Sequence, residues 1–567
     1  MEEETYKQLI NSVQTDDMEK LLAQFAKWHR LTGTPDAQRG AEYIIQELKS
    51  YDIDCECYEF DGYFSDPIKS ELIVADTLIT SRPRSASANC PNGISGEIIY
   101  DYTSKDARLT INEERELYSQ FCGKIVLSWN FYEDYVKKIE AYGAIGLIHI
   151  WTSEEAALHE ETVGPIWGTP TLDNAGQFPV LPVVGIDRKD GYNIIAQATK
   201  EPLKATIHSW VEFKVAKSLL PVAFVPGKTQ EYVLVSGHYD SWYEGVTDNA
   251  TGNAVCLEMA RVFSGLAGKM ERGVKIAWWP GHSNGRYMGS TWYCDHFWQD
   301  LHDNCIGHIN IDSPGSQGGT VILPRTTRVE GARFTADLIT EFLGQEPAAF
   351  LDIPRGADQA FWGVDIPFHI MYKYEPAPDK KIYSSPGSGG GWWWHTEYDS
   401  LDKVDYQLLL RDARMLTATV FRLADAKRLP VDFDAYFDRM LAIFREVDEH
   451  SDVAFDLQPI LAATVSLRDK VQRAITDITD DAKANAVIKM VGGRLNYLMY
   501  SSCDKYHFDN TFPVKPFPGV QRVVNVYKDN TPPETFLFTV TGFIRQRNRF
   551  VNEMRMVEKE LEVLLKA

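Results

Sequence analysis

The sequence predicts an α/β protein with a mostly parallel central sheet, an inserted β-rich module and a helical C-terminal domain. Short apolar runs alternate with helical patterns over residues 232–312, which is typical of βαβ units in a parallel sheet. Strand-like runs dominate residues 85–214, whereas helical periodicity fills the chain after Pro430. We therefore expect the α/β domain in two parts, the insert between them, and the helical domain last: residues 1–84, 85–214, 215–430 and 431–567.

Two amphipathic helices are predicted near the amino terminus. Apolar residues recur at helical spacing over residues 17–29, and a second helix begins at Thr34-Pro35, a capping threonine followed by a proline suited to the first turn. Residues 55–60 and 70–75 are predicted to form two strands. The polar, proline-containing stretch 82–87 is predicted to connect two modules.

The later elements follow from the same periodicities. The insert is predicted to contain strands at residues 123–127 and 146–150 and a helix at 135–142. The elements predicted for the second part of the α/β domain are, in chain order, a strand at 232–236, a helix at 253–263, a strand at 274–279, a helix at 291–301 and a strand at 308–312. The helices predicted for the C-terminal domain lie at 433–450, 455–476 and 481–500.

The composition argues against several classes of function. The 567 residues include 58 basic and 80 acidic side chains, a net charge of −22. Because basic residues form no cluster beyond pairs such as Lys137-Lys138, we expect no binding to nucleic acid or to a membrane. The start Met1-Glu2-Glu3-Glu4-Thr5 lacks a signal-peptide pattern and no apolar run reaches about 18 residues, so we expect a soluble, cytoplasmic protein. The eight scattered cysteines form no C-x-x-C pair and are predicted to be free thiols.

Imidazole and carboxylate side chains stand where predicted strands end. His238 and Asp240 follow one strand, Asp248 precedes the next helix, Asp312 ends a later strand, and His395 follows a loop rich in glycine and tryptophan. The carboxyl ends of parallel strands meet at one edge of a sheet, so these side chains can converge there. Such a set of nitrogen and oxygen donors suits a divalent metal ion such as zinc.

The order of these motifs resembles the co-catalytic zinc metallopeptidases, a family that includes bacterial aminopeptidases and glutamate carboxypeptidase II. The motifs that carry the resemblance are His29-Arg30-Leu31-Thr32-Gly33-Thr34-Pro35, Gly237-His238-Tyr239-Asp240, Asp248-Asn249-Ala250-Thr251-Gly252, Ala357-Asp358-Gln359-Ala360-Phe361, Gly363-Val364-Asp365-Ile366-Pro367 and His395-Thr396. The resemblance implies a zinc-peptidase-like domain and a metal-dependent hydrolase.

The resemblance also implies roles for individual residues. His238 and Asp312 would bind one Zn²⁺ ion, His395 a second, and Asp248 would bridge the two, so one or two ions are expected. Asp240 would orient His238 through the second ring nitrogen of that histidine.

The insert is similar to a protease-associated domain. The runs at residues 123–127, 143–146 and 181–186 occur in the order found in that domain. An insert of this kind followed by a helical domain is the layout of glutamate carboxypeptidase II and the transferrin receptor, which implies a homodimer formed through the helical domain. The alternative is that the insert only covers the cleft.

The loop after the strand at 274–279 departs from the family. The family places two consecutive glutamates there, the first as general base and the second as a ligand of the second metal ion. The loop over residues 280–290 contains no carboxylate. An alignment on Gly285 puts His282 and Ser283 at the two positions, whereas an alignment on Gly289-Ser290 puts Ser283 and Asn284 there.

His282 is the one residue among these candidates that can take up a proton near neutral pH. It can therefore act as the general base. It can instead bind the second metal ion in place of the lost glutamate, or it can be a loop histidine with neither role.

Other residues near these motifs are candidates for substrate binding. Arg286, Tyr287 and Arg355 can donate hydrogen bonds to an oxyanion or a carboxylate. The consecutive tryptophans Trp392–Trp394 indicate either an aromatic wall for a substrate or a plug between domains.

We expect an enzyme, a metal-dependent hydrolase that acts on an amide or related bond of a small molecule or short peptide. Because the loop lacks both glutamates, a non-hydrolytic metal enzyme of the lyase type is an alternative. A non-catalytic receptor or scaffold with the transferrin-receptor layout is another.

Overall fold

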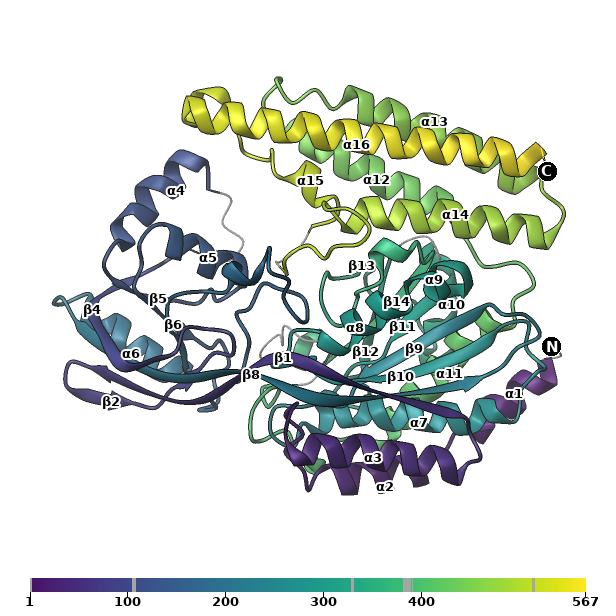
Figure 1. The fold of residues 1–567 in the computed structure, drawn as a ribbon, viewed down its shortest axis with the longest axis horizontal. Helices are drawn as coiled ribbons and strands as arrows, with labels where there is room; N and C mark the ends of the chain where they lie inside the picture. Colours follow the sequence, from purple (N-terminus) through teal and green to yellow (C-terminus); the bar gives the residue numbers. More distant parts are fainter. Residues whose placement is uncertain are drawn as a thin grey trace.

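The computed structural model describes residues 3–103, 109–327, 331–380, 389, 391–511 and 515–566. Three parts are visible in Figure 1: an α/β core, a β-rich module beside it, and a layer of long helices over one side. One 14-stranded sheet runs through the first two parts in the order β13-β12-β14-β11-β9-β10-β8-β4-β5-β6-β7-β3, with β1 and β2 attached at its side. The predicted mixed α/β class is confirmed.

Four parallel strands form the centre of the α/β core. β9 (Tyr232–His238) lies between β10 (Gly273–Trp279) and β11 (Cys305–Asn310), and β14 (Phe368–Glu375) pairs with β11. β9, β10 and β11 consist almost entirely of buried residues, as expected for strands covered on both faces. The antiparallel strands β8 (Lys204–Val225) and β12 (Val321–Thr326) flank them, and β13 (Leu351–Asp352) lies at the edge.

Helices cover the faces of this central sheet. α7 (Thr251–Ser264) follows β9 and is buried over nearly its whole length, while α2 (Asp16–Phe25) and α11 (Tyr406–Ala424) pack against it. α1 (Glu3–Ser12) contacts α11, and α10 (Gly331–Leu343) packs beside α11 and β12. These contacts place the end of β9 and the start of α7 in the interior of the domain.

The amino-terminal helices differ slightly from the prediction. The first predicted helix ends earlier, at Phe25, because the chain turns there and Arg30 folds back to donate hydrogen bonds to backbone carbonyls. α3 (Pro35–Ser50) begins as predicted, and the Thr34 side chain accepts a hydrogen bond from the backbone N–H of Ala37.

The two strands predicted at 55–60 and 70–75 are one strand, β1 (Cys55–Val74). It pairs with β8 along its whole length, with one irregularity between Pro67 and Lys69. The polar middle of β1 carries no strand signal of its own, but the long partner strand supplies continuous hydrogen bonds. In Figure 1 this pair of strands runs from the core into the insert, so the two modules share strands rather than meeting at a flexible linker.

The insert contains its own small layered fold. β4 (Cys90–Tyr100), β5 (Ile125–Ser128), β6 (Gly146–Ile150) and β7 (Val183–Ile186) are parallel neighbours, and β3 (Arg82–Pro83) closes the edge. The helices of the insert are α4 (Ile111–Tyr118), α5 (Glu133–Ala141) and α6 (Arg188–Ala198), and β2 (Thr77–Ile79) pairs with β1. The predicted boundaries between the four segments of the chain stay a prediction.

The predicted helix at 291–301 is two helices. α8 (Met288–His296) ends at His296, because the backbone of Phe297 leaves the helical conformation, and α9 (Trp298–Asn304) follows. The C-terminal layer consists of α12 (Phe433–Glu449), α13 (Gln458–Asp477), α14 (Asp481–Tyr500), the short α15 (Pro518–Gln521) and α16 (Pro533–Lys566). α16 contacts α13, α14 and α15 along the top of Figure 1.

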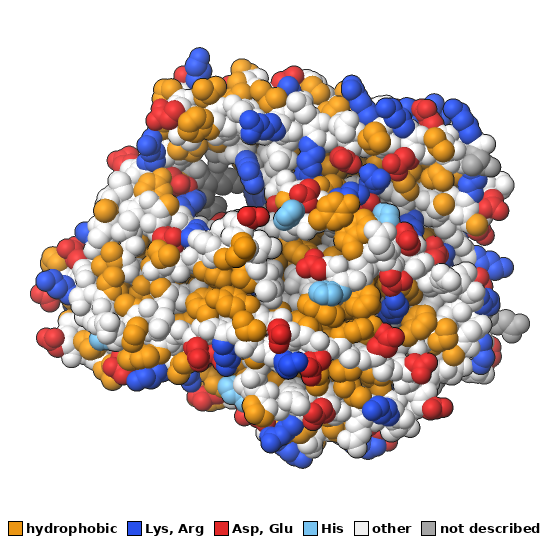
Figure 2. All heavy atoms as spheres, viewed as in Figure 1, with side chains coloured by type: hydrophobic (Ala, Val, Ile, Leu, Met, Phe, Trp, Pro, Cys, Tyr) orange, Lys and Arg blue, Asp and Glu red, His pale blue; other side chains and the backbone are white. Residues whose placement is uncertain are grey.

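Acidic and basic side chains are interspersed over the face drawn in Figure 2, and a hollow opens there between the insert and the C-terminal helices. Among the helices of the described residues, none combines the length and the apolar character that a membrane crossing requires.

Candidate metal centre

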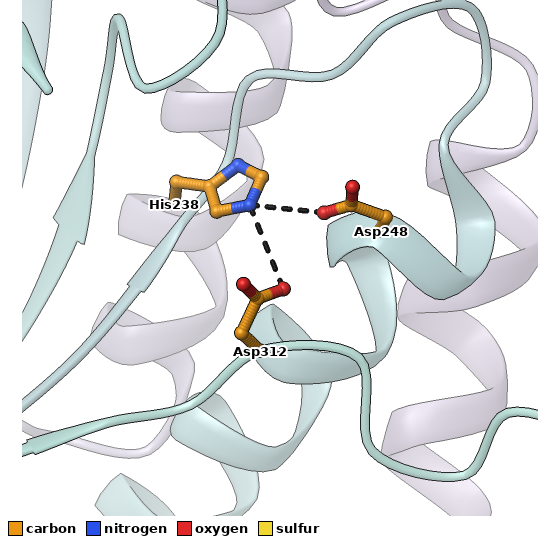
Figure 3. Close-up of side chains that lie close together, drawn as sticks. All are labelled: His238, Asp248 and Asp312. Atoms are coloured by element: carbon orange, nitrogen blue, oxygen red, sulfur yellow. Dashed lines mark ion pairs between the residues drawn. The ribbon is translucent and has the colours of Figure 1, made fainter. Parts of the chain in front are cut away.

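Three side chains from separate elements converge at the carboxyl ends of β9 and β11 (Figure 3). His238 is the last residue of β9, Asp248 lies in the segment Val246–Ala250 just before α7, and Asp312 follows β11 by two residues. His238 Nε2 lies 3.1 Å from Asp248 Oδ1 and 3.8 Å from Asp312 Oδ1. The parallel pairing of β9 with β11 therefore produces the convergence that the sequence predicts.

This cluster has the donors of a metal site. One ligand atom from each of the three residues lies within 4.8 Å of the others, and all three residues are buried. His238 Nε2 and Asp248 Oδ1 are buried polar atoms that face each other as an ion pair and have no further hydrogen-bond partner among the described residues. Such atoms are costly unless a further group binds them, and an imidazole with two carboxylates is a donor set that zinc accepts.

His395 extends the cluster on the other side of Asp248. His395 Nε2 lies 3.0 Å from Asp248 Oδ2, so the two oxygens of one carboxylate face two different imidazoles. Asp399 holds this carboxylate in place because its own oxygens accept hydrogen bonds from the backbone N–H groups of Thr247 and Asp248, at 2.9 and 3.0 Å. Burial raises the pKa of Asp399 to about 7. Asp399 was not among the predicted site residues.

The charges in the cluster favour a cation. Burial alone would lower the pKa of His238, but Asp248 and Asp312 outweigh it and raise that pKa well above its ordinary value. Burial alone would raise the pKa of Asp248, but the two histidines hold it well below the usual range. The buried carboxylates thus stabilise positive charge at this position.

Asp240 contacts the second ring nitrogen of His238 through its backbone carbonyl rather than through its carboxylate. His238 Nδ1 lies 2.9 Å from the backbone carbonyl of Asp240, whereas the Asp240 carboxylate is 3.8 Å away. That carboxylate instead accepts hydrogen bonds from the backbone N–H groups of His282 and Ser283, both at 3.0 Å. Asp240 therefore positions the loop over residues 280–290, because a carboxylate can accept from two adjacent amides at once.

His282 lies beside the cluster and is held by a buried carboxylate. Its ring stacks on His238 with centroids 3.8 Å apart, and its Nδ1 lies 2.7 Å from Asp358 Oδ2. Asp358 Oδ1 also accepts a hydrogen bond from Ser290 Oγ at 2.8 Å. Burial and His238 would lower the pKa of His282, but Asp358 outweighs them and raises it. Among the described residues, the three whose ligand atoms lie within 4.8 Å of one another are His238, Asp248 and Asp312, and His282 does not belong to this set.

The structure also locates Asn284, another residue considered at the lost glutamate positions. Asn284 donates hydrogen bonds to Asp66 Oδ1 and to the carbonyl of Thr32, at 2.8 and 3.3 Å. Its side chain is thus bound to other parts of the core, and the stacking of His282 on His238 makes His282 the loop residue whose ring lies against the cluster.

The arginines predicted as substrate donors have protein partners. Arg286 pairs with Glu133 at the start of α5 in the insert. Arg355 donates a hydrogen bond of 2.7 Å to the carbonyl of Asn510. Tyr287 is buried against Trp167 and lies edge-on to the ring of His282. Of these three residues, Tyr287 is the one whose ring contacts a residue of the centre.

The tryptophan run seals a contact between domains. Trp394 stacks on His395 at 3.4 Å and on Trp151 of the insert at 5.9 Å. The indole N–H of Trp393 donates to Thr247 Oγ at 3.2 Å. Both tryptophans are 7% exposed, which supports the domain-plug interpretation for them. Residues 387, 388 and 390 of the preceding glycine-rich loop lie outside the described residues.

Several residues around the centre have positive φ angles that side chains rarely adopt. They are Arg286 (47°), Tyr287 (64°), Ala357 (51°), Asp358 (62°) and His395 (60°). Strained backbone of this kind persists where the surrounding contacts impose it, and it concentrates at functional sites.

Comparisons with known proteins agree with this geometry. Residues 222–420 match the family model described as Peptidase family M28. The chain is 22% identical over 294 residues to aminopeptidase NAALADL1 of Mus musculus, covering 46% of this chain and 38% of that protein. It is 27% identical over 301 residues to aminopeptidase YwaD of Bacillus subtilis (51% and 58%) and 32% identical over 282 residues to transferrin receptor protein 1 of Gallus gallus (46% and 35%). The matched region thus spans less than two thirds of each of these relatives.

Solved structures show the same fold. An aminopeptidase from Aneurinibacillus sp. strain AM-1 superposes with a TM-score of 0.57 at 21% identity, covering 75% of this chain and 98% of that one. A zinc aminopeptidase from Bacillus subtilis gives a TM-score of 0.53 at 19% identity (75% and 99%). The predicted resemblance to zinc metallopeptidases and the predicted fold are confirmed.

Proposed function

We propose that this chain is a zinc-dependent hydrolase of the aminopeptidase type that cleaves an amide bond in a short peptide or similar small substrate, with a histidine in place of the usual glutamate base. The observation that carries the proposal is the position of Asp248, whose two oxygens face His238 and His395 at 3.1 and 3.0 Å. A carboxylate between two imidazoles is suited to bridging two metal ions.

His238, Asp248 and Asp312 would hold one zinc ion, and Asp248 with His395 would hold another. Bound zinc supplies an activated water molecule and polarises the substrate carbonyl. The walls of the centre are buried, so bulk water is kept from these polar groups.

His282 and Asp358 form the pair that we assign to proton transfer. Because Asp358 accepts the proton of Nδ1, Nε2 of His282 has a lone pair that can accept a proton. The carboxylate also stabilises the imidazolium that results, as in other histidine bases held by a buried aspartate. The same nitrogen can then return the proton to the leaving amine.

Metal content and activity test the proposal together. Zinc per chain is measured by elemental analysis on the wild type, His238→Ala and His395→Ala, with the exposed surface variant His296→Ala as control. We expect about two zinc ions in the wild type and the control and fewer in the two site variants. Hydrolysis of aminoacyl p-nitroanilides should disappear after chelation and return with zinc. A wild-type chain that binds no zinc refutes the proposal.

A non-catalytic receptor-like protein is the second candidate. The loop over residues 280–290 lacks a carboxylate, and part of the chain matches a transferrin receptor. In that case chelation would lower the melting temperature without removing any activity from a panel of aminoacyl and N-acyl amino acid substrates. The homodimer expected from the sequence stays a prediction, which the molar mass in solution can check.

A further inference from the structure

The insert reaches the candidate metal centre at His395. The backbone N–H of Glu160 donates a hydrogen bond of 2.8 Å to the His395 carbonyl, and His395 Nδ1 lies 3.0 Å from the Glu160 carbonyl. Two residues more than 200 positions apart in the chain are thus joined by a hydrogen bond between their backbones and by a hydrogen bond from the imidazole ring of His395. The insert therefore contacts the centre directly.

The hydrogen bond between His395 Nδ1 and the Glu160 carbonyl determines which nitrogen of His395 can bind a metal ion. Nδ1 must carry a hydrogen to donate to the Glu160 carbonyl, so the lone pair is on Nε2. Nε2 is the atom that lies 3.0 Å from Asp248 Oδ2. The stacked ring of Trp394 holds the imidazole from one face.

A second carboxylate of the same segment lies next to this ring. Glu161 Oε2 is 3.8 Å from His395 Nδ1, and Glu161 Oε1 accepts a hydrogen bond from the backbone N–H of Thr162 at 3.0 Å. Glu161 is 8% exposed. The neighbouring Glu160 carboxylate is engaged elsewhere, because Tyr243 donates to it at 3.1 Å and Arg82 lies 3.6 Å away. Glu161 is thus the acidic side chain of the insert that faces His395.

The charge of Glu161 is useful at this position. A negative charge beside the outer nitrogen of a metal-binding histidine increases the basicity of the ring, while the hydrogen bond to the Glu160 carbonyl fixes the orientation of the ring. The loop over residues 280–290 provides no carboxylate on this side of Asp248. A negative charge from the insert compensates for part of that loss.

We infer that Glu161 is a positioning residue of the metal centre, which acts through His395 and makes the insert part of the site that holds the second zinc ion. This inference rests on the proposed function. The centre is therefore composed of residues from two modules of the chain.

The test compares Glu161→Gln with Glu154→Gln. Glutamine keeps the size of the side chain and the acceptor for Thr162 but removes the charge. Glu154 belongs to the same insert, its side chain is 65% exposed, and it pairs with Arg188 on the surface. Zinc affinity is measured by competition with a chromophoric chelator, and zinc content by elemental analysis. We expect Glu161→Gln to weaken the second zinc about 10–100-fold and Glu154→Gln to leave it unchanged.

A double-variant comparison separates positioning from a general loss of structure. If Glu161 acts through His395, Glu161→Gln should cause no further loss of zinc affinity once His395→Ala is present. Additive losses in the double variant, or wild-type affinity in Glu161→Gln, overturn the inference. Glu161→Asp, which keeps the charge, should retain more affinity than Glu161→Gln, and the reverse order also overturns it.

The two hypotheses fail in different ways. A wild-type chain without zinc removes the proposed function and the inference with it. A wild-type chain that binds two zinc ions and hydrolyses its substrate, together with a Glu161→Gln variant of unchanged zinc affinity, removes the inference alone.

Discussion

Replacement of Asp358 by asparagine tests the proton-transfer pair most directly. Asp358 is fully buried, and its two oxygens contact His282 Nδ1 at 2.7 Å and Ser290 Oγ at 2.8 Å. In Asp358→Asn the carbonyl oxygen can still accept from Ser290. The amide group then donates to Nδ1, so the proton of the neutral ring moves to Nε2, which can no longer act as a base.

The size of the effect follows from this change of tautomer. A positioned acid or base contributes about 10²–10⁴-fold to kcat, which corresponds to about 3–5 kcal/mol in the activation free energy. We expect a fall in kcat of that size with zinc content unchanged. Ser290→Ala is the matched control, because it removes the other hydrogen bond of Asp358 at a cost of about 1 kcal/mol and keeps the contact to His282.

The assay measures kcat and zinc per chain on the same preparations, with the substrate to which the wild type responds. A variant that keeps all its zinc and loses less than about threefold in kcat shows that His282 is not the base. A variant that loses one zinc ion shows that His282 is a ligand instead, which would also refute the assignment.

Three further predictions concern stability. Asp240→Asn leaves one of two backbone N–H groups in the loop over residues 280–290 without an acceptor. We expect it to lower the free energy of unfolding by about 1–3 kcal/mol, measured by denaturant unfolding. A change below about 0.5 kcal/mol would contradict the positioning role of Asp240. Trp394→Ala should lower the free energy of unfolding by about 3–5 kcal/mol, and Trp392→Ala should lower it less. Trp394 is 7% exposed and packed between modules, whereas Trp392 is only partly buried. Equal losses would argue against Trp394 as a plug between the domains. Burial raises the pKa of Asp412 to about 6, so the folded chain retains a proton that the unfolded chain has lost between about pH 4 and pH 6. The free energy of unfolding should therefore fall as the pH rises through this window, by up to about 1.4 kcal/mol per pH unit from this group, and Asp412→Asn should lack this component of the slope.

The sequence by itself determined the α/β class and the positions from which metal ligands come. Strands such as β9 and β11 are largely runs of apolar residues, and the polar residues near the end of each run mark in the sequence where the strand ends. Since parallel strands share one carboxyl edge, His238 and Asp312 could be placed at a common site from local pattern alone. The local signals at Thr34-Pro35 likewise predicted where α3 begins.

Only the tertiary structure decided what the side chains contact. Asp240 contacts His238 with its backbone carbonyl and the loop over residues 280–290 with its carboxylate. The spacing of residues in the sequence does not tell which of these two groups faces the histidine. The pairing of His282 with Asp358 and the approach of Glu161 to His395 join residues 76 and 234 positions apart in the chain. β1 formed one strand because β8 was long enough to pair with all of it. Contacts between distant parts of a chain depend on how the layers pack, and a local pattern carries no record of that packing.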